Sequence, residues 1–362
     1  MQVNSRVFLK FQFEFFRKFK ILLATWIRSL FAFSVMILYC TIGIADDSAN
    51  AADSATPTQT TAPQKVIIGI YPMTVYDLNM ASSTFYMDTY IWFRWKGDID
   101  PVSSVEFANG VEGWSTLKVK VYEAPIKQPD GSLYQSMRVT GRFFQPFSLI
   151  NFPLDHQILP IVLENSAYGI DQVVYELDNR DTGHSPHLKI PGWSINGWNS
   201  SVAVHKYDTR FGDDSAGDLS SYSQVRFNIE IQRPVNFFVF KLLLPLVIVL
   251  SATWIALLLP PRMVEARVAM PATVLLTAVF LQQSYTSTLP EVGHLVLLDK
   301  IYVIAYILIL TSIALIIYLA SHFDHQISEQ LAITKKINKV AVFAQISIFM
   351  TGVAVVILTR AT

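Results

Sequence analysis

The stretch QVRFNIEIQRPVNFFVFKLLLPLVIVLSATWIALLL at 224–259 contains an abrupt change of pattern. Up to residue 232, apolar and polar residues alternate, which is typical of a strand with one buried face. From Val235 to Leu259 the only charged residue is Lys241. A helix of that length spans the ~30 Å of a bilayer's hydrocarbon core at about 1.5 Å per residue. The stretch therefore predicts a β-domain that leads directly into a membrane-spanning helix, with Lys241 near the helix end, where its ammonium can reach the interface.

The residues before this stretch, from about 64 to 234, predict an antiparallel β-sandwich. Period-two alternation recurs along the segment, for example in LKVKV at 117–121. Turn signals such as Pro129-Asp130-Gly131 and Gly192 separate the runs at short spacing. Such spacing favours a sandwich over a parallel sheet with crossover helices.

The residues after it, 235–362, predict a four-helix transmembrane domain with spans at about 235–259, 264–289, 297–320 and 339–360. Lys335, Lys336 and Lys339 lie between the third and fourth spans. Positive charges of this kind stay on the cytoplasmic side. An even number of spans then places the sandwich outside the cell membrane. The predicted fold is a membrane protein with an extracellular antiparallel β-sandwich followed by a four-helix transmembrane bundle.

The first 63 residues have a different character. Basic residues, an apolar run from Leu30 to Ile44 and small residues before Asp46 are typical of a secretory signal peptide at 1–45, with a retained membrane anchor as the alternative. Residues 46–63 are polar and Pro-containing, which predicts a disordered linker. Cys40, the only cysteine, lies in the predicted leader, so we expect neither a disulfide nor a cysteine-ligated metal in the mature chain.

Charge argues against nucleic acid as a partner. Residues 1–45 hold six of the 28 Lys and Arg and one of the 28 Asp and Glu, which leaves a net charge of −5 on the remainder. Nucleic-acid binding needs a concentrated basic face. No cofactor is expected, and an enzyme is disfavoured because hydrolase, zinc-protease and nucleotide-binding motifs are absent from the sequence.

The second span is rich in hydroxyl and amide side chains, which are costly against lipid. At about 100° per residue, one face collects seven residues within an arc of about 80°. They are Glu265, Ala269, Thr273, Leu276, Phe280, Gln283 and Ser287. Around a symmetry axis this face would line a water-filled pore. The alternative is a polar helix packed inside a bundle through hydroxyl contacts.

The order of residues along this face suggests distinct roles. Glu265 would form a carboxylate ring that concentrates cations, and Leu276 and Phe280 would form an apolar gate that closes by dewetting. Arg267 lies about 200° from Glu265 and should point away from the axis. Pro271, in the early turns, has no functional interpretation from the sequence.

Four motifs in a fixed order resemble the pentameric ligand-gated ion channels, the Cys-loop receptor superfamily, and specifically its bacterial members. They are Phe152-Pro153-Leu154-Asp155-His156-Gln157, Arg233-Pro234, Pro245 and Leu289-Pro290. The resemblance covers roughly residues 64–362. It departs from the animal members at about Gln145 and Leu159, where those proteins have bridging cysteines and the bacterial members do not.

The resemblance implies a homopentamer in the cell inner membrane, with its ligand-binding domain on the periplasmic or extracellular side. It also implies a coupling junction in which Asp155 pairs with Arg233 and fixes its loop above Pro290. The pore residues it implies are the seven that the helical arc selects, so the expected permeant ions are monovalent cations.

The agonist implied by the resemblance is a small amine bound between subunits by aromatic side chains. Matching local sequence suggests Tyr168, Tyr207 and Tyr222 on one subunit and Tyr90 on its neighbour. The agonist could instead be protons or hydroxide, sensed by His156 or His294 at the junction. The rival function is a membrane-anchored sensor whose sandwich binds a ligand and whose helices do not conduct. A metal site at His322, Asp324 and His325 lacks a fourth ligand, so none is expected.

Overall fold

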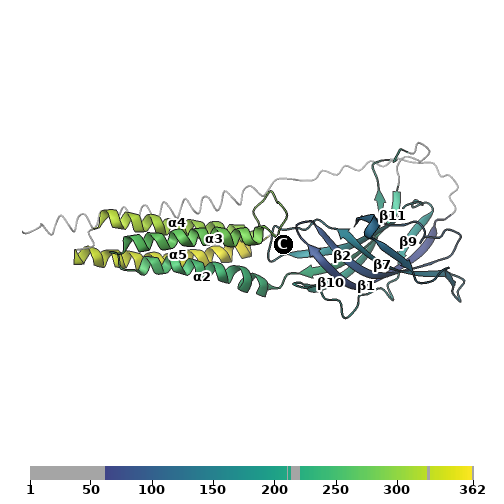
Figure 1. Ribbon diagram of the computed structural model, residues 1–362. Coiled ribbons are helices and arrows are strands. Elements are labelled where there is room, and N and C mark those ends of the chain that lie inside the picture. Colours follow the sequence, from purple (N-terminus) through teal and green to yellow (C-terminus); the bar gives the residue numbers. More distant parts are fainter. Residues whose placement is uncertain (1–61, 210, 213–220, 324–326, 361–362) are drawn as a thin grey trace, which may run out of the picture. The chain divides into compact units, whose positions relative to one another are not determined.

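The computed structural model describes residues 62–209, 211–212, 221–323 and 327–360. The predicted signal peptide and all of the predicted linker except residues 62–63 lie outside this part of the chain. So do Asp324 and His325. The described residues fall within a single compact unit, in which strands come first and helices follow (Figure 1).

Two sheets form the predicted sandwich. The larger has the order β4-β7-β2-β1-β9, with β5 and β6 also paired to β7, and the smaller has the order β10-β11-β8-β3. All pairs are antiparallel except β1 with β9, which are parallel. The strands are β1 (Gln64–Asn79), β2 (Thr84–Trp95), β3 (Val105–Phe107), β4 (Gly110–Val111), β5 (Leu117–Lys120), β6 (Ile126–Lys127), β7 (Leu133–Phe144), β8 (His156–Asn165), β9 (Val173–Leu177), β10 (Ser194–Lys206) and β11 (Ser221–Gln232).

The alternating pattern produces the sandwich core where both sheets face each other. The apolar residues of β11 at 225, 227, 229 and 231 are no more than 2% exposed, and they pack with alternate residues of β1, β2, β7 and β8. The predicted alternation at 117–121 also forms a strand, but its apolar side chains are not half-buried. Leu117 is 60% exposed and Val119 is 48% exposed. β5 pairs with β7, and among the described residues neither Leu117 nor Val119 belongs to the sandwich core.

Four helical segments are long and apolar enough to cross a membrane: Phe237–Leu258, Val264–Thr286, Leu297–His322 and Ser328–Leu358. The first combines a π-helical turn, η2 (Phe237–Leu243), with α2 (Leu244–Leu258), and the others are α3, α4 and α5. The change from π to α geometry falls at Leu244, next to Pro245, which has no N–H to continue the helical hydrogen bonds. The last helix begins at Ser328, before the predicted span at 339.

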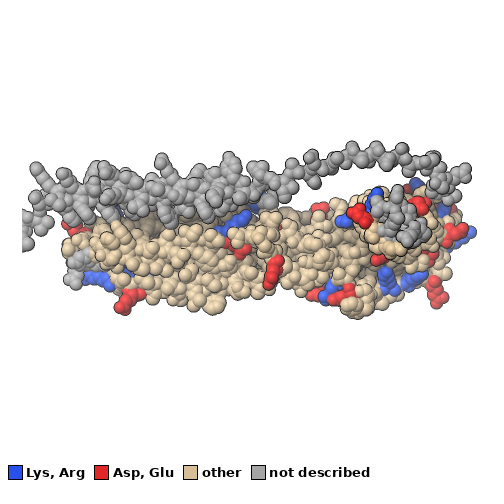
Figure 2. Space-filling model, turned by 90° about the horizontal axis from the view of Figure 1, so that it is seen from above, with Lys and Arg blue, Asp and Glu red and all other residues tan. Residues whose placement is uncertain are grey.

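The four helices pack against one another, and their outer surface is apolar. Figure 2 shows few Lys, Arg, Asp or Glu side chains on the visible surface of the helices, whereas charges are frequent on the strands. The chain is therefore a multi-pass membrane protein. Because lipid cannot hydrogen-bond a backbone, helices are the elements expected there.

Arg267 explains how α3 is fixed against α2. Its side chain is fully buried and donates from Nε to the carbonyl of Ala256 at 3.1 Å and from Nη2 to that of Leu257 at 3.3 Å. Those carbonyls belong to the last turn of α2, which lacks helical partners and carries partial negative charge. Arg267 thus points away from Glu265, as expected, and its partner is a helix end rather than an acid or a lipid headgroup.

Replacing Arg267 by methionine should lower the thermal stability of the purified protein. Methionine keeps most of the volume but leaves both α2 carbonyls without donors, at a cost of about 1–3 kcal/mol each. Arg267→Ala should lower stability further because it also leaves a cavity. Heating followed by size-exclusion chromatography measures the loss.

The exposed Lys336→Met is the matched control, since it removes a cation from the helical domain without breaking a buried contact. Equal melting of Arg267→Met and wild type would show that the two bonds do not stabilise the bundle.

Candidate functional site

The loop between β7 and β8 is held at the junction between strands and helices by Asp155. Asp155 is 1% exposed, and its Oδ1 accepts a bond from Nε of Arg233 at 3.0 Å. Its Oδ2 accepts a bond from Nε2 of Gln157 at 2.8 Å. Gln157 also pairs with both backbone groups of Ser148. The expected Asp155–Arg233 pair is present, but the second carboxylate oxygen binds Gln157, so the pair is not bidentate.

Three aromatic rings surround the Arg233 guanidinium. Its carbon lies 4.2 Å from the ring centroid of Trp193 and 5.1 Å from those of Phe152 and Phe237. A guanidinium at this distance from a ring face gains about 0.5–2 kcal/mol, more as it is desolvated. Trp193 was missed by the sequence reasoning, because it comes from the β9–β10 loop and nothing in its local sequence connects it with residue 233.

The loop docks directly on the helices. The backbone N–H groups of Leu297 and Leu298, at the start of α4, donate to the carbonyls of Ile150 and Phe152 at 3.0 and 3.2 Å. The Phe152 ring stacks on Tyr285 of α3 with centroids 6.0 Å apart. Leu149, Leu154 and the β1–β2 turn residue Met80 share one apolar cluster with the helices.

Pro290, the third predicted coupling residue, lies in the α3–α4 loop, close to where the β7–β8 loop contacts the helices. It lines a cavity of about 580 Å³ together with Tyr285, His294 and Asp299. The backbone bonds that fix the β7–β8 loop are made to Leu297 and Leu298, after the proline loop, rather than to Pro290 itself.

The seven predicted pore residues all lie on the exposed side of α3. Glu265, Ala269, Thr273, Leu276, Phe280, Gln283 and Ser287 are each exposed in the single chain. Leu276 and Phe280 are 56% and 65% exposed, although both are apolar. The buried residues of α3 are Arg267, Pro271, Val274, Ala278 and Tyr285, on the opposite side. The stripe therefore faces away from the chain's own bundle.

Gln282, another polar residue of α3, bonds to α4 and does not belong to the exposed stripe. Gln282 donates to Asp299 Oδ1 at 3.0 Å and accepts from the Tyr306 hydroxyl at 2.6 Å, and Tyr285 donates to the same carboxylate oxygen at 2.6 Å. Asp299 also accepts the N–H of Val296. This network joins α3 to α4. Gln282 therefore does not require water beside it, whereas the exposed Gln283 does.

The predicted ligand-binding tyrosines do not all meet in one chain. Tyr207 and Tyr222 contact each other edge to face, with centroids 5.8 Å apart. Tyr168 follows β8 and packs partly against the sandwich core. Tyr90 lies on β2, in the other sheet, beneath the guanidinium of Arg138 at 5.8 Å. Arg138 is in turn paired with Asp88, whose pKa it lowers by hydrogen bonding.

A buried carboxylate beside the tyrosines was also missed. Glu164, 4% exposed at the end of β8, accepts from the Tyr207 hydroxyl at 2.9 Å, pairs with His205 Nδ1 at 2.6 Å, and accepts from the Gln224 amide. The sequence shows only an acid after an apolar run. Its partners come from two other strands, so no local pattern indicates the cluster.

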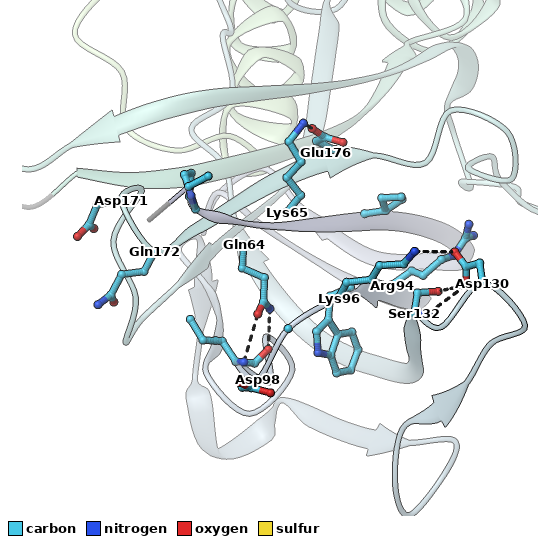
Figure 3. Close-up of a pocket in the computed structure, with 16 residues that line it drawn as sticks. Gln64, Lys65, Arg94, Lys96, Asp98, Asp130, Ser132, Asp171, Gln172 and Glu176 are labelled. Carbon is cyan, nitrogen blue, oxygen red and sulfur yellow. Dashed lines mark hydrogen bonds and ion pairs between the residues drawn. The ribbon is translucent and has the colours of Figure 1, made fainter. Parts of the chain in front are cut away.

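Another cavity, of about 1040 Å³, lies at the end of the sandwich where β1 begins and β2 ends. Figure 3 shows its charged side chains, most of them engaged with one another. Lys65 pairs with Glu176 at 2.6 Å, and Lys96 lies 3.9 Å from Asp130. The basic side chains of this cavity are thus paired with acids, and no feature of it singles out a ligand.

Comparison with known proteins finds γ-aminobutyric acid receptor subunits among the relatives of this chain. No family model matches the chain. It is 27% identical over 199 residues to a γ-aminobutyric acid receptor subunit beta of Lymnaea stagnalis, covering 54% of this chain and 37% of the relative. It is 26% identical over 175 residues to the human subunit rho-3, covering 47% and 35%. The chain thus spans little more than a third of the length of the curated relatives it matches.

The coupling role expected from the sequence predicts that Asp155→Asn leaves expression and assembly intact but strongly reduces the response to an agonist. Asparagine keeps an acceptor for Arg233 yet removes the charge that holds it among the three rings. The measurement is current per unit of surface protein. Asp178→Asn is the matched control, because Asp178 is equally buried and pairs with Arg94 at 3.3 Å at the far end of the sandwich. Normal currents from Asp155→Asn would exclude a coupling role for the pair.

Proposed function

Because this chain is a homologue of γ-aminobutyric acid receptor subunits and has the strand-then-helix architecture of the Cys-loop receptor superfamily, we propose that it is a subunit of a ligand-gated ion channel. Five identical copies surround one pore. The protein lies in the cell inner membrane, with the sandwich on the periplasmic or extracellular side.

The observation that carries this proposal is the exposed stripe of α3. Its seven residues face away from their own bundle, and they include hydroxyl and amide groups that are costly against lipid. Some hydroxyls are satisfied on the helix itself, as Thr273 is by the carbonyl of Ala269 at 3.0 Å. Gln283, Ser284 and Glu265 need a wet environment, and a central pore supplies one. In a non-conducting sensor, the rival function, such a stripe would have no use.

The charge on the stripe favours cations. Glu265 is exposed near the start of α3, and the nearby Arg267 is buried with its charge directed at the α2 carbonyls. A ring of carboxylates at one end of the pore attracts cations, and rings of Leu276 and Phe280 further along close it by dewetting. The relatives named above are γ-aminobutyric acid receptor subunits, whose channels are anion-selective, so the cation preference proposed here rests on Glu265 alone.

The ligand proposed is a small amine. Tyr207 and Tyr222 stand beside the carboxylate of Glu164, and an ammonium group is attracted both by ring faces and by the anion. Tyr90 lies on the other sheet and is available to an adjacent copy. Opening by pH is the alternative stimulus. His156 and His294 are both exposed at the junction.

Cysteines introduced on the stripe should react with a charged, membrane-impermeant thiol reagent while the channel is open. In a Cys40→Ser background, Leu276→Cys and Gln283→Cys are expected to be modified, with block of current. Val274→Cys and Ala278→Cys are the matched controls, because both positions are buried on the opposite face. Equal reaction rates on both faces, or a monomeric protein in detergent, would exclude the pore.

Glu265→Gln should reduce the preference for cations. Reversal potentials recorded in a salt gradient should move toward the value of a non-selective pore. Glu329→Gln is the control, since Glu329 is exposed at the start of α5, away from the stripe. An unchanged reversal potential would remove Glu265 from its role, and an anion-selective wild type would overturn the proposed selectivity while leaving the channel itself.

A further inference from the structure

Glu164 connects strands that are not neighbours. It lies on β8, whereas His205 is on the outermost strand β10 and Tyr207 directly follows that strand. The sheet order β10-β11-β8-β3 places β11 between them. The bonds from His205 Nδ1 at 2.6 Å and the Tyr207 hydroxyl at 2.9 Å therefore reach across β11 to the carboxylate. Gln224, on β11, completes the cluster.

β10 has few other side-chain contacts to hold its end. It is an edge strand, paired only with β11. Residues 201–204 are all exposed, and His205 is only half-buried. An edge strand with little apolar burial depends on its polar contacts for order. Backbone pairing with β11 continues to Lys206, so just beyond it Tyr207 is fixed by its bond to Glu164 and its edge-to-face contact with Tyr222.

The charges around His205 come from four neighbouring strands as well as its own. Glu106 on β3 is paired in register with Glu164, so a second carboxylate lies beside the first. Lys118 on β5 approaches β3 through the carbonyl of Val105 at 3.0 Å. The other groups are Tyr222 and Arg226 on β11, Tyr207 directly after β10, and Lys206 next to the histidine on β10, where successive side chains point to opposite faces of the sheet.

We propose that His205 and Glu164 form a pH-dependent fastener that binds the end of β10 to β8 tightly when the imidazole is protonated and loosely when it is neutral. Histidine is the side chain whose charge ordinarily changes between about pH 5 and pH 8. A bond between imidazolium and carboxylate is roughly twice as strong as a neutral one.

The remaining bonds to Glu164 do not share this dependence. Burial, together with the bond to Glu164, raises the pKa of Tyr207 to about 12, so its hydroxyl remains a donor throughout this range. The Gln224 amide has no charge to lose. A neutral fastener is therefore weakened rather than abolished, and the change is confined to one bond.

The inference deepens the proposed function, because Tyr207 and Tyr222 belong to the proposed ligand site. The contact between His205 and Glu164 does not depend on the proposed function. Only its consequence rests on that function, namely that pH alters the order of one wall of the ligand site. His156 and His294, the histidines considered from the sequence, lie at the other end of the sandwich domain, where the strands meet the helices. The pairing with a buried carboxylate distinguishes His205 from both.

Hydrogen–deuterium exchange of the purified full-length protein tests the fastener without any current. The readout is the protection of amides at 203–209, corrected for the chemical exchange rate at each pH, with a peptide from β2 as the internal reference. Between pH 5.5 and pH 8.5, protection in the wild type should fall about fivefold, which is the difference expected between a charged and a neutral hydrogen bond.

Variants separate the fastener from a merely structural cluster. His205→Lys carries a cation over the whole range and should keep protection high at both pH values. His205→Gln is neutral and should give low, pH-independent protection, and Glu164→Gln should do the same. A wild type whose protection does not change with pH, or a His205→Gln that retains the fivefold fall, would overturn the proposal. Either result leaves the channel assignment untouched, because that assignment depends on α3.

Discussion

The contact between Arg233 and Asp155 is the constraint on which the junction of strands and helices depends. Arg233 is the first residue after β11 and comes just before the first membrane helix, so its position sets where that helix begins. Asp155 fixes it to the β7–β8 loop, and the rings of Trp193, Phe152 and Phe237 exclude water from its guanidinium. A buried charge left without its partner is strongly destabilising, and this keeps the loop, the strand end and the helix start together.

The same loop continues the connection toward α3. Phe152 stacks on Tyr285, and Tyr285 donates to Asp299, which also binds Gln282. The inner side of α3 is thereby attached to α4 and, through Phe152, to the sandwich. Its outer side is left with the exposed stripe. Packing thus divides α3 into a face that is attached to α4 and to the sandwich and a face that is exposed.

The proposed ligand site depends on other contacts than the junction between strands and helices. The proposed ligand-binding tyrosines lie on the two different sheets of the sandwich, so the proposed aromatic site would combine two copies of the chain. Glu164 lies on the sheet that carries Tyr222, and it binds both Tyr207 and His205. Under the proposed function, one carboxylate would therefore influence both the ligand site and the order of the strand end beside it.

Local patterns were sufficient for the larger features. Period-two alternation in β11 predicted a buried face, and apolar length predicted four membrane helices. The helical period of α3 selected seven residues that all prove to be exposed, and the spacing between Glu265 and Arg267 correctly separated their directions. The same reasoning placed LKVKV at 117–121 on a half-buried strand, and this was wrong because alternation does not show whether a second layer is present.

The sequence by itself determined the order of strands and helices, the membrane character and the outward face of α3, because each depends on periodicity within one segment. Only the tertiary structure decided that Trp193 covers Arg233, that Gln157 takes the second oxygen of Asp155, and that Glu164 collects His205 and Tyr207 from across β11. Apart from the bond between Gln157 and Asp155, those contacts join residues that are about 40 positions apart in the sequence. Hydrogen bonds and ring contacts of this kind are set by strand register and loop path, which no local pattern contains.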